Sequence, residues 1–300
     1  VRLARLIDQA APAAPYPRPM PMPSAAQRLV DISATGLDRL RSDPYQFYAG
    51  KILALSAMDG LDSDPSPALR GEAVHAILDR WHRQGGSLMA IADEELDRLS
   101  AHPLMRGLWR PRLMQALAWV EAQIVAGEAD GRKVAVTETW GHMEVDGVRV
   151  HGKVDRIDAL PDGALAIIDY KTGQPPTGRE VEAGFALQLG TLGLIAEAGG
   201  FPGVAGLPER FEYWSLAKKD DAFGFVREPV KEGRKTSGLP RDKFLPRTRE
   251  FLHDAIARWI RGHEPFTARL NPDVGGYNDF DQLMRLDEWQ ARGSDAGGAE

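Results

Sequence analysis

An aspartate and a lysine stand two residues apart at the end of an apolar stretch, in Ile168-Asp169-Tyr170-Lys171. Apolar β-branched residues favour strands, and side chains along a strand alternate between its faces, so Asp169 and Lys171 are expected to project the same way. A carboxylate can bind a divalent cation, and a neighbouring ammonium can stabilise a phosphate or orient an attacking water. A surface ion pair at a strand end would give the same pattern, so this pair alone does not establish a catalytic site.

A second acid lies on a strand expected just upstream, over residues 148–158. Apolar and polar residues alternate along this segment, with the period of a strand that has one buried face. Asp155 falls on the polar face. The turn residues 161–163 (Pro-Asp-Gly) separate this strand from the one that carries Asp169. The two strands are therefore expected to pair as a hairpin that brings both acids together.

A histidine lies at the edge of a helix predicted over about residues 69–84. The helix is indicated by an apolar stripe at helical spacing, formed by Val74, Ile77, Leu78 and Trp81. A lone histidine beside such a stripe is usually a core residue, but near Asp155 and Asp169 His75 becomes a candidate metal ligand. Glu72, one turn earlier, is a weaker candidate.

Three more polar residues are considered for the same site. Gln188 lies in a predicted helix over residues 180–198 and offers an amide that can anchor the site. Asp158 is a candidate for the outer part of the site. Glu138 lies on a strand predicted over residues 134–145, and an ion pair at the edge of the core is favoured for it over a place in the site.

The order of these motifs resembles a known family. Gly71-x-x-x-His75, residues 152–158, residues 168–173 and Gln188 together resemble the RecB-type branch of the PD-(D/E)xK nucleases. The flanking segments 32–37, 43–48, 277–280 and 287–289 resemble the C-terminal nuclease module of the AddB subunit of AddAB helicase–nucleases. The resemblance extends from about residue 32 to residue 289.

This resemblance implies a Mg²⁺-dependent DNA exonuclease module, with Mn²⁺ as a substitute, that degrades one strand at double-strand breaks. The implied catalytic residues are Asp155, Asp169, Lys171 and Gln188. The implied metal ligands are His75, Asp155, Asp169 and the carbonyl of Tyr170. The implied partners are single-stranded DNA at duplex ends and an AddA-like helicase–nuclease subunit.

The sequence departs from the family in two places. The tyrosine that usually follows the glutamine by four positions is Leu192 here, which puts a substrate contact in doubt. Some AddB relatives hold an iron–sulfur cluster through four cysteines, but this chain has no cysteine and carries Asp43 at the first of those positions, so no such cluster is expected. Packing is expected to replace it, through Tyr45, Phe47, Tyr277 and Phe280.

Two other functions remain open. A DNA-end-binding scaffold without cleavage is favoured by Leu192 and disfavoured by the complete set of Asp155, Asp169 and Lys171. A stand-alone RecB-like exonuclease is disfavoured by the missing cysteine clusters and by the proline-rich leader, which suits a module fused to another segment.

The 300-residue chain is 43% hydrophobic and has a formal net charge of -6. It lacks cysteine, any apolar run of the roughly 20 residues that a membrane span needs, and a visible signal peptide, so a cytoplasmic protein without membrane contact is expected. Residues 218–249 hold ten basic and five acidic residues. This local excess suggests phosphate binding, although a solvated loop would look the same. The candidate DNA-binding residues are Lys218, Lys219, Arg234 and Lys235.

The predicted fold is α/β, with a restriction-endonuclease-like core of order αβββαβ in which helices flank a mixed sheet. A helix over residues 104–125 and another from residue 248 add to this core, as do strands over 211–216 and 223–226. The Pro/Ala-rich residues 1–30 are predicted to be a linker, 31–290 the nuclease domain and 291–300 a disordered tail.

Overall fold

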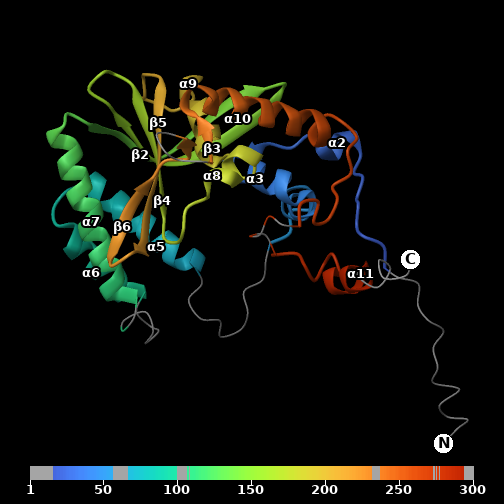
Figure 1. Cartoon of the computed structure of the whole chain (residues 1–300), viewed down its shortest axis with the longest axis horizontal. Coiled ribbons are helices and arrows are strands. Elements are labelled where there is room, and N and C mark those ends of the chain that lie inside the picture. The colour runs from blue at the N-terminus through green and yellow to red at the C-terminus, as the bar shows by residue number, and fades with distance from the viewer. Residues whose placement is uncertain are drawn as a thin grey trace, which may run out of the picture.

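A mixed β-sheet forms the centre of the molecule (Figure 1). The structure is a computed structural model that describes residues 16–56, 67–99, 107, 109–231, 237–272, 274, 276 and 278–293. Within these residues the main sheet has six strands. They are β1 (Ile32–Ser33), β2 (Lys133–Val145), β3 (Val148–Ala159), β4 (Leu165–Lys171), β5 (Pro208–Lys219) and β6 (Ala222–Arg227).

Strand β3 pairs with different strands along its two edges. One edge pairs antiparallel with β2 along nearly its whole length. The other edge is divided between β1, which is parallel at Val150 and His151, and β4, which is antiparallel from Arg156 to Ala159. The residues of β3 between these two partners, Asp155 among them, therefore have no ladder partner on that edge.

Turn chemistry and one crossover account for the remaining connections. Asp146 and Gly147 join β2 to β3 with φ values of 51° and 71°, the left-handed conformation that a two-residue hairpin turn of this sequence favours. β4 pairs parallel with β5 through a helical crossover, and β5 pairs antiparallel with β6. The expected αβββαβ order and the mixed sheet with helices on both faces are confirmed.

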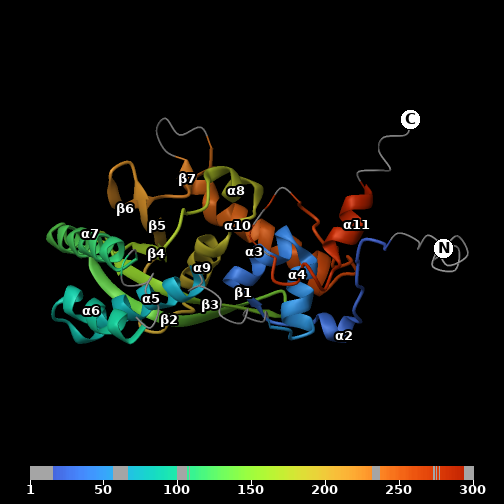
Figure 2. The same cartoon turned by 90° about the horizontal axis from the view of Figure 1, so that it is seen from below.

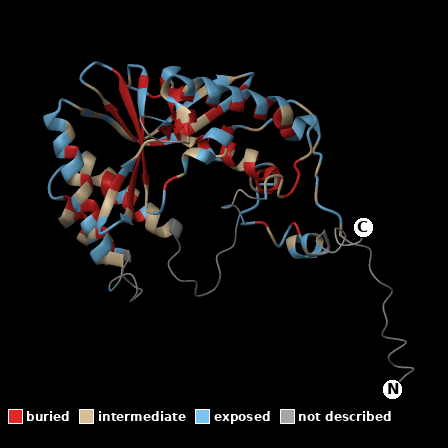
Figure 3. Ribbon diagram, in the orientation of Figure 1, coloured by how far each residue is buried: buried red, intermediate tan, exposed pale blue. Residues whose placement is uncertain are grey.

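Helices cover both faces of the sheet (Figures 1 and 2). One face carries α5 (Pro67–Gln84), α6 (Leu88–Leu99) and α7 (Arg110–Ala129), which pack on apolar residues of β4 and β5. The other carries α9 (Gln188–Glu197), α10 (Arg241–Ala255) and α3 (Ala34–Ser42). Buried residues follow these two interfaces in Figure 3. The smaller elements are α2 (Ala25–Arg28), α4 (Pro44–Phe47), η1 (Tyr48–Ile52), α8 (Gly178–Ala183), β7 (Val230–Lys231), β8 (Leu239–Pro240), η3 (Ile256–Ile260) and α11 (Leu286–Gly293).

Some predicted helices have other limits. The helix predicted over 180–198 is wrong as one piece, because Gly184, at a φ of 79°, ends α8 and the chain begins α9 anew at Gln188. α10 starts at Arg241, seven residues before the expected position. α7 starts at Arg110, and α6 lies where the sequence pattern predicts no helix.

The proline-rich segment packs against the domain in its described part. The carbonyls of Pro19 and Pro21 accept hydrogen bonds of 2.9 Å from the backbone N–H groups of Ala268 and Phe266. Arg28 is 2% exposed and donates to the carbonyls of Trp259 and Glu264 at 3.0 and 2.8 Å. Residues 16–30 therefore pack on the domain, whereas an extended linker is predicted there. Residues 1–15 and 294–300 lie outside the described residues.

The C-terminal segment is held to α4 by both polar and apolar contacts. Asp43 accepts hydrogen bonds from the backbone N–H groups of Arg269 and Gln46 at 3.1 and 3.4 Å. Tyr45 and Phe280 share a small apolar cluster, whereas Phe47 packs in the neighbouring cluster beneath α3 and α10. Tyr277, expected to join them, lies outside the described residues.

Candidate active site

The site is built where β3 and β4 separate. Their pairing ends at Arg156 and Ile168, one residue before the two candidate acids would face each other. Asp155 Oδ2 instead accepts a 2.7 Å hydrogen bond from the backbone N–H of Tyr170. This bond satisfies a backbone donor that lost its ladder partner. It also holds Asp155 next to Asp169, as the hairpin predicted.

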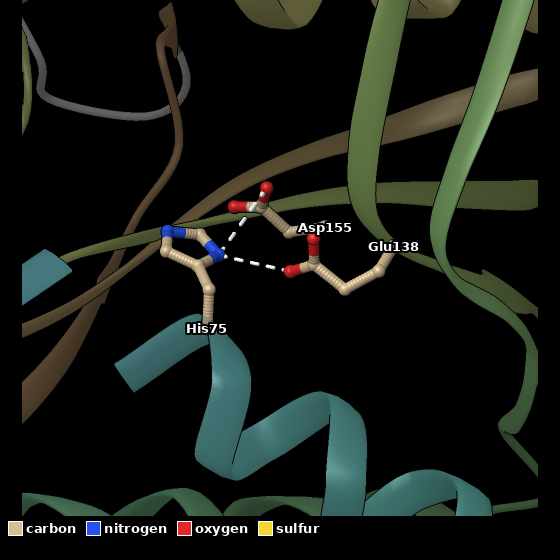
Figure 4. Close-up of side chains that lie close together, drawn as sticks. All are labelled: His75, Glu138 and Asp155. Carbon is tan, nitrogen blue, oxygen red and sulfur yellow. Dashed lines mark hydrogen bonds and ion pairs between the residues drawn. The ribbon is translucent and has the colours of Figure 1, made fainter. Parts of the chain in front are cut away.

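His75 approaches Asp155 from α5 (Figure 4). Its Nδ1 lies 3.6 Å from Asp155 Oδ1 and 3.0 Å from Glu138 Oε1. One possible ligand atom from each of these three residues lies within 4.8 Å of the others. An imidazole and two carboxylates at this separation have the donor atoms that suit a divalent cation.

Glu138 thus has two contacts. Its Oε2 lies 2.6 Å from Lys153 Nζ, which is the ion pair that was expected. Its other oxygen faces His75, so Glu138 lies at the site as well as in the ion pair that the sequence favours for it. Glu138 has a φ of 44°, an uncommon conformation for a residue with a side chain. It lies across from Asp155, between the paired residues Thr137 and Thr139 of β2.

Asp169, Lys171 and Gln188 form a closed polar ring. Asp169, which is 2% exposed, has its Oδ2 2.8 Å from Lys171 Nζ. Gln188 donates from Nε2 to Asp169 Oδ1 at 2.6 Å and accepts from Lys171 Nζ at 3.0 Å. The amide therefore fixes both the carboxylate and the amine. Because Gln188 is the first residue of α9, its position depends on where that helix begins.

The electrostatics of the site favour an added positive charge. Burial, followed by the charge of Asp169, raises the pKa of Asp155 to about 7. Burial opposes the charged form of His75, but the hydrogen bond with Glu138 and the charge of Asp155 outweigh it and raise the pKa of His75. Burial also opposes the charged form of Lys171, but the charge of Asp169 outweighs it and raises the pKa of Lys171. A divalent cation would relieve the repulsion between the two acids.

Asp38 is a buried residue beside the site that no sequence motif indicates. Its Oδ1 accepts a 2.5 Å hydrogen bond from the backbone N–H of Leu187, the residue that precedes α9. Burial is the main cause that raises its pKa to about 7, and the charges of Lys171 and Asp169 also act on it. Asp38 therefore anchors the helix end that carries Gln188. No local pattern in the sequence marks it, because its partner is 149 residues away.

Two of the weaker candidates lie away from this cluster. Asp158 is a candidate for the outer part of the site, but its carboxylate pairs with Arg132 and Arg156 at 2.5 and 2.9 Å. Asp158 registers with Ala166, on the face packed by α7. Glu72 is exposed and belongs to no cluster of possible metal ligands among the described residues.

The basic candidates and Leu192 lie in different surroundings. Lys218 and Lys219 are exposed at the end of β5, and Lys218 Nζ lies 3.8 Å from Asp221. Arg234 and Lys235 lie outside the described residues. Leu192 is 1% exposed and packs in the apolar core beneath α9. It faces Gly152 so closely that a Cβ at that glycine would lie 2.6 Å from its side chain.

Comparison with known proteins gives the family. The sequence pattern of the PD-(D/E)XK nuclease superfamily matches residues 31–272. The chain belongs to the PD-(D/E)XK nuclease superfamily. The match includes the whole sheet and every residue of the cluster described above.

Individual relatives of this nuclease-superfamily chain are distant. It is 25% identical over 186 residues to an uncharacterized protein of Rickettsia bellii and 26% identical over 189 residues to one of Rickettsia conorii. Each alignment covers 57% of this chain and only 22% of the relative, so the chain matches about a fifth of their length. A solved structure named as a candidate exonuclease from Eubacterium rectale has a TM-score of 0.47 at 14% identity, covering 86% of this chain and 94% of that one. No helix among the described residues is long and apolar enough to cross a bilayer.

Proposed function

We propose that this chain is a metal-dependent deoxyribonuclease that hydrolyses DNA phosphodiesters. The observation that carries the proposal is the meeting of His75, Glu138 and Asp155 beside the ring of Asp169, Lys171 and Gln188. The expected ligands Asp155 and His75 would hold Mg²⁺ or Mn²⁺, with Asp169 and the Tyr170 carbonyl beside them. Glu138 joins this set on the evidence of its position. All of these residues offer oxygen or nitrogen atoms, which suit such a cation.

The side chains of this site would have different roles in the reaction. When bound, the metal would lower the pKa of a water molecule and neutralise charge on the phosphate. Lys171, whose raised pKa keeps it charged, would stabilise negative charge that develops on the scissile phosphate. Gln188 holds Lys171 and Asp169 at a fixed separation, so both are positioned before substrate binds. Asp155 contributes its carboxylate while Tyr170 N–H holds it in place.

The finer assignment is an exonuclease module of an AddAB-type helicase–nuclease. The substrate would be one strand at a double-strand break, and the partner an AddA-like helicase–nuclease subunit. The motif order and the flanking segments of this chain support the assignment. So does the match to about a fifth of much longer relatives, which suits a module. Residues 31–290 remain the proposed nuclease domain, and a cytoplasmic location is part of the same proposal.

One observation favours a second function, namely DNA-end binding without efficient cleavage. Leu192 replaces the family's tyrosine and is buried in the core, so it supplies no hydroxyl to the substrate. A scaffold of this kind would bind DNA and leave it intact.

A cleavage assay separates the two functions. End-labelled single-stranded oligonucleotides are incubated with the chain in Mg²⁺, in Mn²⁺ and in EDTA. A nuclease shortens them only with metal, and Asp169→Asn lowers the rate by about two orders of magnitude or more without changing the thermal unfolding temperature greatly. Asp130→Asn, at an exposed helix end, is the matched control and keeps the wild-type rate. Equal cleavage by wild type and Asp169→Asn would contradict the assignment.

A further inference from the structure

A cavity of about 440 Å³ opens beside the carboxyl end of β4. Its walls come from α5, α7, β5 and β6, together with the residues that follow β4. The lining includes Arg70, Trp109, Arg112, Thr172, Gly173 and Phe223. The volume lies within the range of roughly 300–1,000 Å³ typical of small-molecule sites, so one nucleotide fits by size.

The two arginines of the cavity differ from other arginines of α5 and α7 in their carboxylate partners. Arg80 of α5 pairs with Glu94 and Glu95, and Arg110 of α7 pairs with Asp93 and Asp97. Arg70 and Arg112 have no carboxylate partner among the described residues, and none of the residues that line the cavity is acidic. The cavity is therefore locally positive although the chain as a whole carries a net charge of -6. A guanidinium presents a planar fork of donors that matches a phosphate.

The rest of the wall suits a base. Trp109 is half-buried in the wall and packs, like Phe223, against the core beneath α7. The apolar Leu113 and Leu216 lie beside them. Aromatic and apolar surface next to positive charge is the combination by which proteins hold single-stranded nucleic acid, because every base can stack while the phosphate is bound.

The cavity lies next to the candidate active site along the chain. Thr172 and Gly173, which line it, directly follow Lys171, a member of the ring with Asp169 and Gln188. Ser215, which registers with Lys171, donates a 2.9 Å hydrogen bond to the Gly173 carbonyl and fixes this segment. Arg70 comes from α5, the helix that also supplies His75.

We propose that this cavity binds a nucleotide of the single DNA strand next to the scissile phosphate. Arg70 and Arg112 bind its phosphate, and Trp109 stacks with its base. The inference rests on the proposed nuclease function and deepens it by assigning the substrate strand to one side of the site. A free nucleotide released by cleavage offers the same phosphate and base, and the experiment distinguishes it from a nucleotide within the strand.

The test measures binding of a fluorescein-labelled dT12 oligonucleotide to the whole chain by anisotropy, in EDTA so that no cleavage occurs. The double variant Arg70→Gln/Arg112→Gln is expected to weaken binding about tenfold or more at low salt. The slope of log affinity against log salt should become shallower by about 1.4, since each lost contact to a single strand contributes about 0.7. Arg210→Gln, an exposed arginine at the opposite end of β5, is the matched control and should bind as wild type.

The aromatic contact is tested separately. Trp109→Phe should keep most of the affinity and Trp109→Leu should lose part of it, because leucine fills space but does not stack. Competition with dTMP tests whether the cavity binds a free nucleotide, such as the product of cleavage. If dTMP displaces dT12 and the displacement requires Arg70 and Arg112, the cavity binds a single nucleotide, as proposed. If dTMP binds through both arginines while dT12 affinity is unchanged in the double variant, the cavity holds the released product and the assignment to the strand is overturned.

Failure of this inference is distinguishable from failure of the nuclease proposal. Wild-type affinity and salt slope in the double variant would overturn the cavity assignment, even if the wild type cleaves DNA in Mg²⁺. Arginine-dependent binding with no cleavage in any metal would instead uphold the cavity and overturn the nuclease proposal.

Discussion

Asp155 accepts a 2.7 Å hydrogen bond from the backbone N–H of Tyr170, at the point where β3 and β4 stop pairing. The bond replaces a rung of the ladder, so this carboxylate is part of the sheet as well as of the candidate metal site. Its two functions can be separated, because an amide oxygen can accept the same hydrogen bond without carrying charge.

Asp155→Asn is expected to fold like the wild type and to lose metal binding. Asp155→Ala removes the acceptor as well, leaves the part-buried Tyr170 N–H unpaired, and should cost about 1–3 kcal/mol of unfolding free energy. Urea unfolding in EDTA measures stability, and calorimetric titration with Mn²⁺ measures binding. Wild-type affinity for Mn²⁺ in Asp155→Asn would remove this residue from the ligand set.

Metal affinity should rise with pH between about 6 and 8. Burial and the charge of Asp169 raise the pKa of Asp155 to about 7, so below that pH much of this carboxyl is neutral and must lose its proton before it can bind a cation. Binding near pH 6 should therefore release protons and be weaker than at pH 8. Calorimetry in two buffers of different ionisation enthalpy counts the protons. The same affinity and no proton release at pH 6 would contradict this role of Asp155.

Asp38→Ala should lower kcat more than it changes KM, because it frees the end of the helix that carries Gln188. Loss of the hydrogen bond to Leu187 N–H should cost about 1 kcal/mol of stability. Asp38→Asn keeps an oxygen acceptor and should retain most of the activity. If both variants have wild-type kcat, Asp38 has no part in positioning Gln188.

Asp38 should also make the stability of the protein depend on pH. The pKa of Asp38 is raised to about 7 by burial, so between pH 4 and 7 the folded protein holds a proton that the unfolded chain has lost. The contribution of Asp38 to stability is thus fully present below about pH 4 and is lost as pH rises through 7. Asp38→Asn, which cannot ionise, should become relatively more stable than the wild type as pH increases over this window. Urea unfolding of both proteins at pH 5 and pH 8 checks this sign.

Asp43→Ala should destabilise the protein by about 1–3 kcal/mol and leave kcat unchanged. The substitution removes the acceptor for the N–H groups of Gln46 and Arg269, and with it the polar link between α4 and the C-terminal segment. Thermal unfolding gives the stability, and cleavage of a labelled oligonucleotide gives the rate. Asp279→Ala, which removes an exposed ion pair with Arg39 in the same region, is the control and should cost much less. Equal effects of the two substitutions would argue against a special role for Asp43.

Strand period and turn chemistry, both local, determined much of the candidate site from sequence. Asp169 and Lys171 share a face because side chains two apart in a strand must. Asp155 lies near Asp169 because a turn at residues 161–163 joins antiparallel strands of known period. His75 lies at the edge of the apolar face of its helix because the apolar residues around it recur every three to four positions. These rules involve neighbours in sequence, so no other part of the chain is needed to apply them.

Contacts between distant segments decided the rest. Glu138 faces His75 because the backbone of β2 takes a φ of 44° there, which its sequence does not indicate. Asp38 reaches Leu187 across 149 residues, and Gly184 breaks a stretch whose composition favours one helix. Within the described part of the chain, Arg70 and Arg112 have no carboxylate partner beside the end of β4, whereas Arg110, two residues before Arg112, pairs with Asp93 and Asp97. The sequence by itself determined which residue types face which way along each element, and only the tertiary structure decided which of them meet, because packing energies depend on distances that local periodicity does not specify.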